Sequence, residues 1–366
     1  MSRTLRLFQP GDSAAVADLC RRSVVDARIP LSVDRSPDFS LLDELQSDRW
    51  DIILVEEDQR LIAFADLVHV DLPYRNQSIP ATYGRLGGIH PDYQGKGVFR
   101  NLVMKTYEVM AERGTRMFFG LVNQKNEKMK RAIASRTVQD PWLLNHRLEI
   151  HSVLPVSRCR PVGEYRYRKA TAEDTPALAG LLSGHNQRYL FGPPVTADDL
   201  AGTVDKYPDF SIDDILVAED RRGLPVACAG FWDQSRARKV RVASYRLLET
   251  MLRPAWNLFA RTTGLRPMPR PGGLLQMLFA TLVAAKSDHQ DALAGLWRQA
   301  SSRLLCRNYH FLLVACFSHD PLNRTLQGIR RLTSVNRFVV TTPDPDVFQI
   351  LQDETAAIPY LDYALS

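Results

Sequence analysis

The sequence predicts an α+β protein made of two tandem α/β sandwiches, each with a mixed, mostly antiparallel central sheet flanked by helices. The main observation is an internal repeat with a constant offset of 162 positions. RLFQPGDSAAVADL, from Arg6, aligns with RKATAEDTPALAGL, from Arg168, and DIILVEEDQR, from Asp51, aligns with DDILVAEDRR, from Asp213. In addition, each copy contains two apolar strands joined by a short charged turn, which is typical of a hairpin. Hairpins within a mixed order of strands and helices favour an α+β sandwich over a doubly wound parallel sheet.

The elements are expected in the same order in both copies. A short strand comes first, and an acid after it, Asp12 or Asp174, marks the start of an Ala/Leu-rich helix because aspartate is a favoured N-cap residue. A hairpin follows, and later a buried strand with a polar helix behind it. The predicted hairpin strands are 52–55 with 61–68 and 215–217 with 225–231, and the later strands are 117–122 and 311–316.

The chain of 366 residues is long enough for two ordinary domains. The seam between the copies, HSVLPVSRCRPVGEYR, contains Pro155, Pro161 and Gly163, which are typical of a linker. We therefore expect an N-terminal domain at 1–155 and a C-terminal domain at 164–366.

Composition indicates a globular protein, with 45% hydrophobic and 24% charged residues. The first fifteen residues alternate polar and apolar side chains and do not resemble a signal peptide. The apolar stretch Leu274–Ala285 contains Gln276 and is shorter than the roughly 20 residues that span a bilayer. The five cysteines are widely spaced and form no metal-ligand pattern, which predicts free thiols, no metal site and a cytoplasmic location. They are Cys20, Cys159, Cys228, Cys306 and Cys316.

Positive charge is concentrated in one insert of the second copy, at about 235–272. Between Ser235 and Arg270 there are nine Arg or Lys residues against the single acid Glu249, whereas the whole chain carries a net charge of +6. Apolar residues recur in the insert near helical spacing, and Pro254 is expected to kink or split the helix. They are Leu248, Met251, Leu252, Trp256 and Phe259.

Two interpretations of this insert stay open. It is either an amphipathic lid that meets a membrane surface or an anionic acceptor, or a segment whose apolar face packs on the protein itself or on a second subunit of a homo-oligomer. It has no recognised nucleic-acid-binding motif, so no nucleic-acid partner is expected.

The stretch GIHPDYQGKGVFRNL predicts a tight glycine loop between a strand and a helix, where backbone N–H groups can bind phosphate. It is not a P-loop, because Lys96 lies between Gly95 and Gly97 and no hydroxyl residue follows. It is not a dinucleotide fingerprint either, because Arg100 stands where the third glycine is needed. The remaining pattern is Gln/Arg-x-x-Gly-x-Gly/Ala.

This pattern resembles the acyl-CoA pyrophosphate loop of the GCN5-related N-acetyltransferase (GNAT) superfamily, and the tandem layout resembles its two-domain members. The resemblance implies an N-acetyltransferase that moves an acetyl group from acetyl-CoA, or from another acyl-CoA, to a small-molecule or peptide amine. It also implies that Gly88, Ile89 and His90 pair with the pantetheine arm and that the N–H groups of 94–100 surround the pyrophosphate. The implied cofactor-binding residues are Gly88, Ile89, His90, Gln94, Gly95, Lys96, Gly97, Val98, Phe99, Arg100 and Asn126.

Phe99 departs from the small residue that the pattern has at its end. The departure is acceptable if Phe99 points inward, and the helical spacing predicts that it does. The predicted inward face consists of Phe99, Leu102, Val103, Thr106 and Met110.

Two side chains that members of the superfamily use for catalysis, a glutamate and a tyrosine, are missing at the matching positions. Tyr83 stands where some members of the superfamily have a glutamate, and Ile133 stands where the usual acid tyrosine would be. The remaining candidates are Tyr83 itself and two titratable residues on the hairpin, His69 and Asp66. A non-catalytic sensor or scaffold that binds acyl-CoA is therefore the alternative function.

The second copy has no glycine at the corresponding loop, which reads Lys286-Ser287-Asp288-His289. A backbone with side chains cannot approach a pyrophosphate in the same way. The sequence therefore predicts one CoA for each chain, bound in the first domain.

Overall fold

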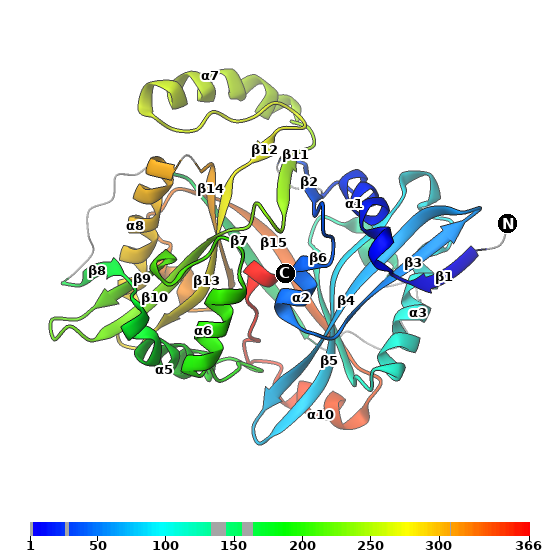
Figure 1. Ribbon diagram of the computed structural model, residues 1–366, viewed down its shortest axis with the longest axis horizontal. Coiled ribbons are helices and arrows are strands. Elements are labelled where there is room, and N and C mark those ends of the chain that lie inside the picture. Colours follow the sequence, from blue (N-terminus) through cyan, green and yellow to red (C-terminus); the bar gives the residue numbers. More distant parts are fainter. Residues whose placement is uncertain (1–2, 26–28, 133–143, 156–163, 308) are drawn as a thin grey trace. The chain divides into compact units, whose positions relative to one another are not determined.

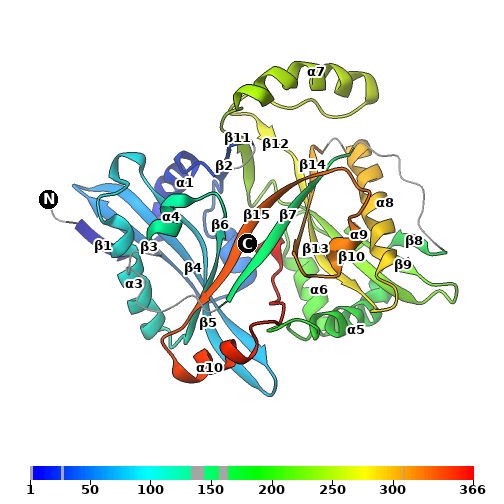
Figure 2. The ribbon, with the colours of Figure 1, turned by 180° about the vertical axis from the view of Figure 1, so that it is seen from behind.

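The computed structural model describes residues 3–25, 29–132, 144–155, 164–307 and 309–366. The chain forms two compact units, and each is described by itself below (Figures 1 and 2). Unit 1 comprises Met1–Arg147, Ala237–Ser244 and Val335–Ala356, and unit 2 comprises Leu148–Arg236, Tyr245–Ser334 and Ala357–Ser366.

Unit 1 contains a mixed sheet in the order β1-β3-β4-β5-β6-β15. All neighbouring strands are antiparallel except β5 and β6, which are parallel. The strands are β1 (Arg3–Leu7), β3 (Trp50–Glu57), β4 (Arg60–Tyr74), β5 (Gln77–Ile89), β6 (Met117–Asn123) and β15 (Arg331–Thr341), whose residues from Val335 onward belong to this unit. A separate antiparallel pair joins β2 (Leu31–Asp34) to β11 (Lys239–Val242).

Helices pack on both faces of this sheet because its strands alternate. Ile52 and Leu54 of β3 lie in one core cluster with α1, whereas Ile53 and Val55 lie in another with α3. The helices of unit 1 are α1 (Ser13–Arg22), α2 (Leu41–Gln46), α3 (Val98–Glu112), α4 (Glu127–Ala132) and α10 (Pro345–Asp353), with 3-10 turns at Pro10–Asp12 and Pro91–Tyr93.

Unit 2 repeats this plan with the order β7-β14-β13-β10-β9-β8 and one parallel pair, β13 with β14. Its strands are β7 (Leu144–Val153, from Leu148), β8 (Arg166–Lys169), β9 (Ile215–Glu219), β10 (Pro225–Asp233), β12 (Leu274–Leu275), β13 (Met277–Ala285) and β14 (Phe311–Phe317). Its helices are α5 (Thr175–Asn186), α6 (Ala197–Lys206), α7 (Leu247–Thr263), α8 (Asp291–Arg307) and α9 (Leu322–Thr325), with 3-10 turns at Ala172–Asp174, Ile212–Asp214 and Tyr363–Leu365.

Equivalent contacts recur at the aligned positions of the two copies. The Nη1 atom of Arg6 lies 2.6 Å from Oδ2 of Asp12, and Nη1 of Arg168 lies 2.6 Å from Oδ2 of Asp174. Each aspartate also accepts a backbone N–H at 2.8 Å, from Gln9 or Thr171, at the start of the following helix. The last strand of each sequence copy belongs to the sheet of the other copy. Strand β7, from the first copy, pairs with β14 in unit 2, and most of β15, from the second copy, pairs with β6 in unit 1. Strand pairing along the chain therefore does not follow the copy boundary.

Of the two effects expected of Pro254, a kink or a split of the insert helix, the split does not occur. Helix α7 is assigned without interruption from Leu247 to Thr263, with Pro254 inside it. The missing N–H of Pro254 leaves the carbonyl of Thr250 without its helical donor, and Thr250 is exposed, so water can satisfy that carbonyl. Among the described residues, no helix combines the length and apolar character needed to cross a membrane.

Candidate functional site

The glycine loop of unit 1 lies where the sequence predicts it, between the end of β5 and the start of α3. Gly95 and Gly97 both have left-handed backbones, with φ of 79° and 78°. A Cβ atom at Gly95 would meet no heavy atom within 4 Å, and at Gly97 it would meet only Nη1 of Arg3 at 4.0 Å. These glycines are therefore required by backbone conformation, and the space beside them is open.

The start of α3 has no side-chain cap, because its N-cap residue is Gly97, which has no side chain to accept a hydrogen bond. The first N–H groups of a helix have no partner within the helix, and the helix dipole makes them attractive to anions. Residues 94–97 are exposed, so these donors face an accessible loop. The geometry is that of an anion site.

Arg3, the first residue of β1, contacts this loop although it lies far from it in the sequence. Its Nη1 donates to the carbonyl of Lys96 at 2.9 Å, and its Nε donates to Oε1 of Glu57 at 3.1 Å. The ammonium of Lys96 lies 5.2 Å from the centre of the Tyr93 ring, and Arg100 is exposed on the first turn of α3. Sequence reasoning missed Arg3, because nothing local relates it to a loop more than ninety residues away.

The neighbouring strands β5 and β6 separate before either of them ends. Their pairing runs from Ala81 with Met117 to Gly84 with Gly120 and then stops, although β5 continues to Ile89. The separation coincides with a bulge in the β4–β5 ladder, where Asp66 pairs with Leu86 but Leu67 pairs with Gly84. Within the described pairings, no strand covers this side of the last residues of β5.

Strand alternation decides which backbone groups face this open side. The N–H of His90 donates to the carbonyl of Ile62 at 2.8 Å. Hydrogen-bonded and non-hydrogen-bonded pairs alternate in an antiparallel ladder, so Gly88 also faces β4, while Gly87 and Ile89 face away from it. The side-chain amide of Gln94 donates to the carbonyl of Ile89 at 3.4 Å, in agreement with this orientation. Gly87, which sequence reasoning missed, and Ile89 are therefore better placed than Gly88 and His90 to pair with an extended ligand.

The glycine at position 88 has a packing role instead. A Cβ atom there would lie 2.6 Å from Oγ of Ser23 and 2.7 Å from the ring of Phe64. The ring of His90 is engaged as well, with Nε2 at 2.8 Å from the Arg60 guanidinium.

The predicted inward face of α3 is confirmed at Leu102 and Met110, whereas its other members, Phe99, Val103 and Thr106, are only half-buried. Val98 is buried with Leu102 and Met110, but Phe99 is only half-buried. The helix therefore begins with Val98 in the core, and Phe99 lies at the margin of the loop.

Asn126 acts as a helix cap in this structure. Its Oδ1 accepts the N–H of Met129 at 3.0 Å at the start of α4. Ile133, in place of the usual acid tyrosine, lies outside the described residues.

The three catalytic candidates are all in the interior. Tyr83 is 1% exposed and stacks on Phe119, with the ring centres 5.0 Å apart. His69 is fully buried between Thr82 Oγ1 and Asp51 Oδ2, each at 3.0 Å. These placements, and that of Asp66 below, give no support to a direct catalytic role.

Asp66 belongs to a buried cluster of four charges. Arg35 donates to Asp66 at 2.6 Å and to Asp43 at 2.9 Å, and Arg85 donates to Asp43 at 2.7 Å. Burial raises the pKa of Asp43 to about 7, against the attraction of the two arginines. Because Arg85 is the extra residue of the β5 bulge, the cluster anchors the point where β5 and β6 separate.

The corresponding loop of unit 2 is closed by side chains. The hydroxyl of Tyr165 donates to Oδ1 of Asp291 at 2.7 Å and lies 3.1 Å from Nδ1 of His289, directly at the start of α8. The described residues of this loop contain no glycine.

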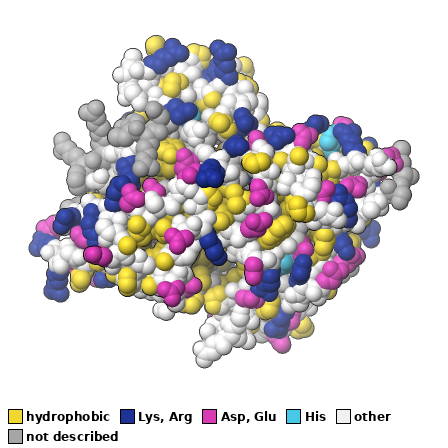
Figure 3. All heavy atoms as spheres, viewed as in Figure 1, with side chains coloured by type: hydrophobic (Ala, Val, Ile, Leu, Met, Phe, Trp, Pro, Cys, Tyr) yellow, Lys and Arg dark blue, Asp and Glu magenta, His cyan; other side chains and the backbone are white. Residues whose placement is uncertain are grey.

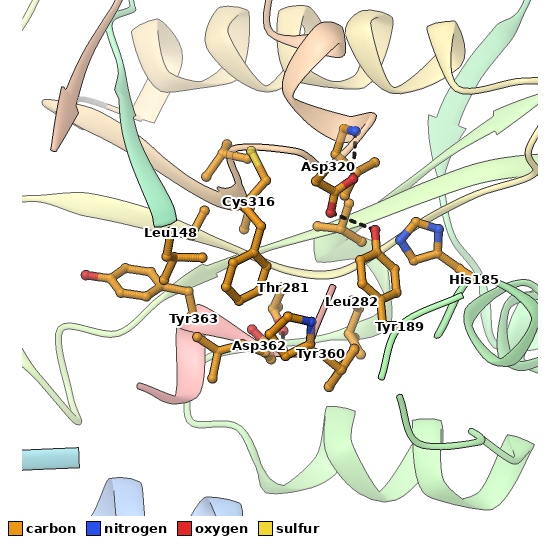
Figure 4. Close-up of a pocket in the computed structure, with 18 of the residues that line it drawn as sticks. Leu148, His185, Tyr189, Thr281, Leu282, Cys316, Asp320, Tyr360, Asp362 and Tyr363 are labelled. Atoms are coloured by element: carbon orange, nitrogen blue, oxygen red, sulfur yellow. Dashed lines mark hydrogen bonds between the residues drawn. The ribbon is translucent and has the colours of Figure 1, made fainter. Parts of the chain in front are cut away.

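The strands β13 and β14 of unit 2 also separate, after Phe279 pairs with Leu313, but the chain's own C-terminal segment fills the gap (Figure 4). Tyr360 donates its N–H to the carbonyl of Leu190 at 2.8 Å, and Asp362 accepts from the Thr281 hydroxyl at 2.6 Å. The cavity left beside this segment has about 80 Å³, well below the roughly 300–1,000 Å³ of typical ligand pockets.

The walls of this cavity are mostly apolar, with a few polar side chains among them. The Tyr189 hydroxyl donates to Oδ2 of Asp320 at 2.8 Å, and the two side chains face each other in Figure 4. Burial raises the pKa of Asp320 and of Asp362, and burial lowers the pKa of His185 to about 4.

No protein-family model and no curated protein matches this sequence. Several solved structures are nevertheless similar to this chain in fold. A GCN5-related N-acetyltransferase from Sphaerobacter thermophilus aligns at a TM-score of 0.58 and 13% identity, over 93% of this chain and 94% of its own. A Saccharomyces cerevisiae N-myristoyltransferase with bound myristoyl-CoA aligns at 0.61 and 13% identity, over 94% and 86% of the two chains.

A third similar structure is the GCN5-related glucosamine N-acetyltransferase region of a fungal multi-domain GH3 β-N-acetylglucosaminidase. It aligns at a TM-score of 0.59 and 13% identity, over 92% of this chain and 38% of that chain. These likenesses confirm the predicted fold class.

Proposed function

We propose that this chain, which has the GNAT fold, is an acyl-CoA-dependent N-acyltransferase that binds one acyl-CoA in unit 1 and transfers an acetyl group to an amine. The observation that carries the proposal is the open glycine loop at the uncapped start of α3. Gly95 and Gly97 let the backbone approach a ligand closely, and the N–H groups that follow suit a pyrophosphate. Lys96 and Arg100 add positive charge beside it.

The open edge of β5 is suited to bind the pantetheine arm of the cofactor. A pantetheine arm contains two amides, so it can pair with a strand edge as an added strand does. Gly87 and Ile89 present their backbone groups on that edge. The arm would then lead from the loop toward the point where β5 and β6 separate, at Gly84 and Gly120.

The packing of aromatic side chains where β5 and β6 separate favours a short acyl group. Tyr83 and Phe119 lie next to the last paired residues, and Phe119 also contacts Phe338, with ring centres 5.7 Å apart. All three rings are at least 95% buried, so they fill the core there. An acetyl group requires far less room than a long acyl chain.

The proposed reaction needs few side chains. The amine nitrogen attacks the thioester carbonyl, the C–N bond forms, and the C–S bond breaks with its electron pair leaving on sulfur. The ammonium proton passes to water, and the thiolate takes up a proton from water. Orientation of the bound pair supplies much of the acceleration, on the order of 7–11 kcal/mol.

The burial of Tyr83, His69 and Asp66 favours a second candidate function, a non-catalytic acyl-CoA sensor. One experiment separates the two. The purified chain is titrated with CoA and acetyl-CoA by calorimetry, and free-thiol release is followed with a panel of small amines and peptides. Thiol release that depends on an amine supports the enzyme, binding without release on every acceptor supports the sensor, and absence of binding contradicts both.

The same assay tests two finer points. Acyl-CoAs of increasing chain length should lose activity beyond the shortest members if the aromatic packing limits the acyl group. The binding stoichiometry should be one, because the loop and the strand gap of unit 2 are both filled.

A further inference from the structure

Helix α7 carries most of its large apolar side chains on the outside. At 100° per residue, six apolar side chains fall within one arc of roughly 140°. All six are exposed, by 47% to 79%: Leu247, Leu248, Met251, Leu252, Leu258 and Phe259. A surface helix of a globular protein normally has the opposite arrangement.

The polar side of α7 is used to hold the segment that follows it, and the two run side by side in Figures 1 and 2. Arg253 donates to the carbonyl of Pro269 at 3.0 Å. The side chain of Asn257 donates to the carbonyl of Met268 at 3.1 Å and accepts its N–H at 2.8 Å. These contacts fix the helix so that its apolar arc faces away from the chain that supports it.

The surroundings of this apolar arc are strongly basic. In the unit 2 segment that contains α7, residues 245–270, there are five arginines and the single acid Glu249. Arg246 at the N-terminal end of α7 and Arg261 in its last turn are both exposed. Figure 3 shows yellow and dark blue side chains next to one another on this helix.

We propose that α7 is an interfacial anchor that lies flat on an anionic lipid surface, with its apolar arc among the acyl chains and its arginines at the headgroups. An exposed amphipathic helix with basic flanks is the kind that binds such surfaces. With 17 residues α7 is about 25 Å long, which suits a helix lying in the plane of the surface. Charge selects lipid over a second copy of the chain, because pairing two copies here would bring together two segments, residues 245–270 of each, that have five arginines against one acid.

The anchor does not depend on the proposed acyl transfer, and its test does not use that activity. The full chain is sedimented with phosphatidylcholine vesicles that contain or lack phosphatidylserine. Binding is expected only with phosphatidylserine and should weaken as salt is raised, because exposed charges are screened.

Two variants and a control localise the effect. The double variant Met251→Asp/Leu258→Asp should lower vesicle binding about 100-fold, because each of the two apolar side chains kept in water forfeits roughly a factor of ten. Arg246→Gln/Arg261→Gln should bind more weakly and with less salt dependence. Leu224→Asp, at a side chain that is 52% exposed in the β9–β10 turn, should bind like the unchanged chain.

Three results would overturn the proposal. They are no sedimentation of the unchanged chain with phosphatidylserine vesicles, equal binding of the double variant, and a dimer in sedimentation velocity that the double variant disperses. The last result would identify a second copy as the occupant of the apolar arc. None of them bears on acyl-CoA binding in unit 1, so the two proposals fail separately.

Discussion

A charge placed at Gly97 separates the anion-binding role of the loop from its structural role. We compare Gly97→Asp with Gly97→Asn, which have nearly the same shape and differ in charge. Both residues tolerate the left-handed conformation better than most, so both pay a similar cost of about 1 kcal/mol at φ of 78°. The open space around Gly97 accommodates either side chain without a clash.

The magnitude follows from the position of Gly97 as the N-cap of α3. A pyrophosphate held by the next N–H groups would place its charge about 5 Å from the new carboxylate. At an effective dielectric constant near 20, each pair of unit charges at that distance repels by about 3 kcal/mol. The Asp variant should therefore bind CoA about 100-fold more weakly than the Asn variant.

Stability should change in the opposite direction. A carboxylate at the start of a helix interacts favourably with the helix dipole, by about 0.3–1 kcal/mol. The Asp variant should thus be at least as stable as the Asn variant in urea unfolding, although it binds CoA more weakly. This combination excludes misfolding as the cause of lost binding.

Calorimetric titration with CoA at low and high salt measures the effect. The affinity gap between the variants should shrink as salt rises. Gly114→Asp is the control, because Gly114 has a φ of 66° and open space but lies at the other end of α3. Equal CoA affinity of the Asp and Asn variants at low salt would refute the assignment of this loop.

Three further predictions concern stability and are read by urea unfolding. Arg35→Met should cost about 3–5 kcal/mol, because it leaves the buried carboxylate of Asp66 without its arginine and removes one of the two arginines of Asp43. The ion pair of Arg49 is exposed, so Arg49→Met should cost less than about 1 kcal/mol. Similar costs for the two variants would contradict the buried cluster. The hydrogen bond from Arg168 lowers the pKa of Asp174 to about 2. The ionised carboxylate therefore stabilises the fold by about 1–2 kcal/mol above pH 4, and this contribution is lost as pH falls toward 2. Asp174→Asn should remove this part of the acid dependence of the unfolding free energy, and an unchanged pH profile would contradict the role of Asp174. Gly84→Ala should lower the free energy of unfolding by about 1–3 kcal/mol, because the added Cβ would lie 2.4 Å from the Phe118 ring. In the double variant, Phe118→Leu should relieve part of that loss. Purely additive effects of the two substitutions would contradict the contact.

The sequence was sufficient for features that depend on a few neighbouring residues. Gly95 and Gly97 need left-handed backbones in a turn between a strand and a helix, and the spacing of the surrounding residues indicates that turn directly. The N-terminal acids Asp12 and Asp174 likewise act at the starts of helices, as predicted.

Features that depend on distant partners could not be predicted in the same way. His69 is a catalytic candidate from its strand alone, but Asp51 and Thr82 make it a buried structural residue. Arg35, which pairs with Asp66, carries no local signal. For α7, the spacing of apolar residues predicts a helix but cannot say which way its apolar face is turned, because that depends on the segment to which Arg253 binds.

The two copies differ in how they treat the same opening in the sheet, and this difference is the reason for our proposal that only unit 1 binds a cofactor. In each unit a parallel pair of strands begins together and then separates, beside a bulge in the preceding ladder. A strand edge opened in this way has backbone groups that must find partners. In unit 2 the segment around Tyr360 and Asp362 occupies the gap, and side chains close the loop at Asp291. In unit 1 the described residues provide no such covering segment, and the glycine loop beside the gap stays open. The loss of glycine and the filled gap thus coincide in one unit, as expected if loop and gap serve one extended ligand.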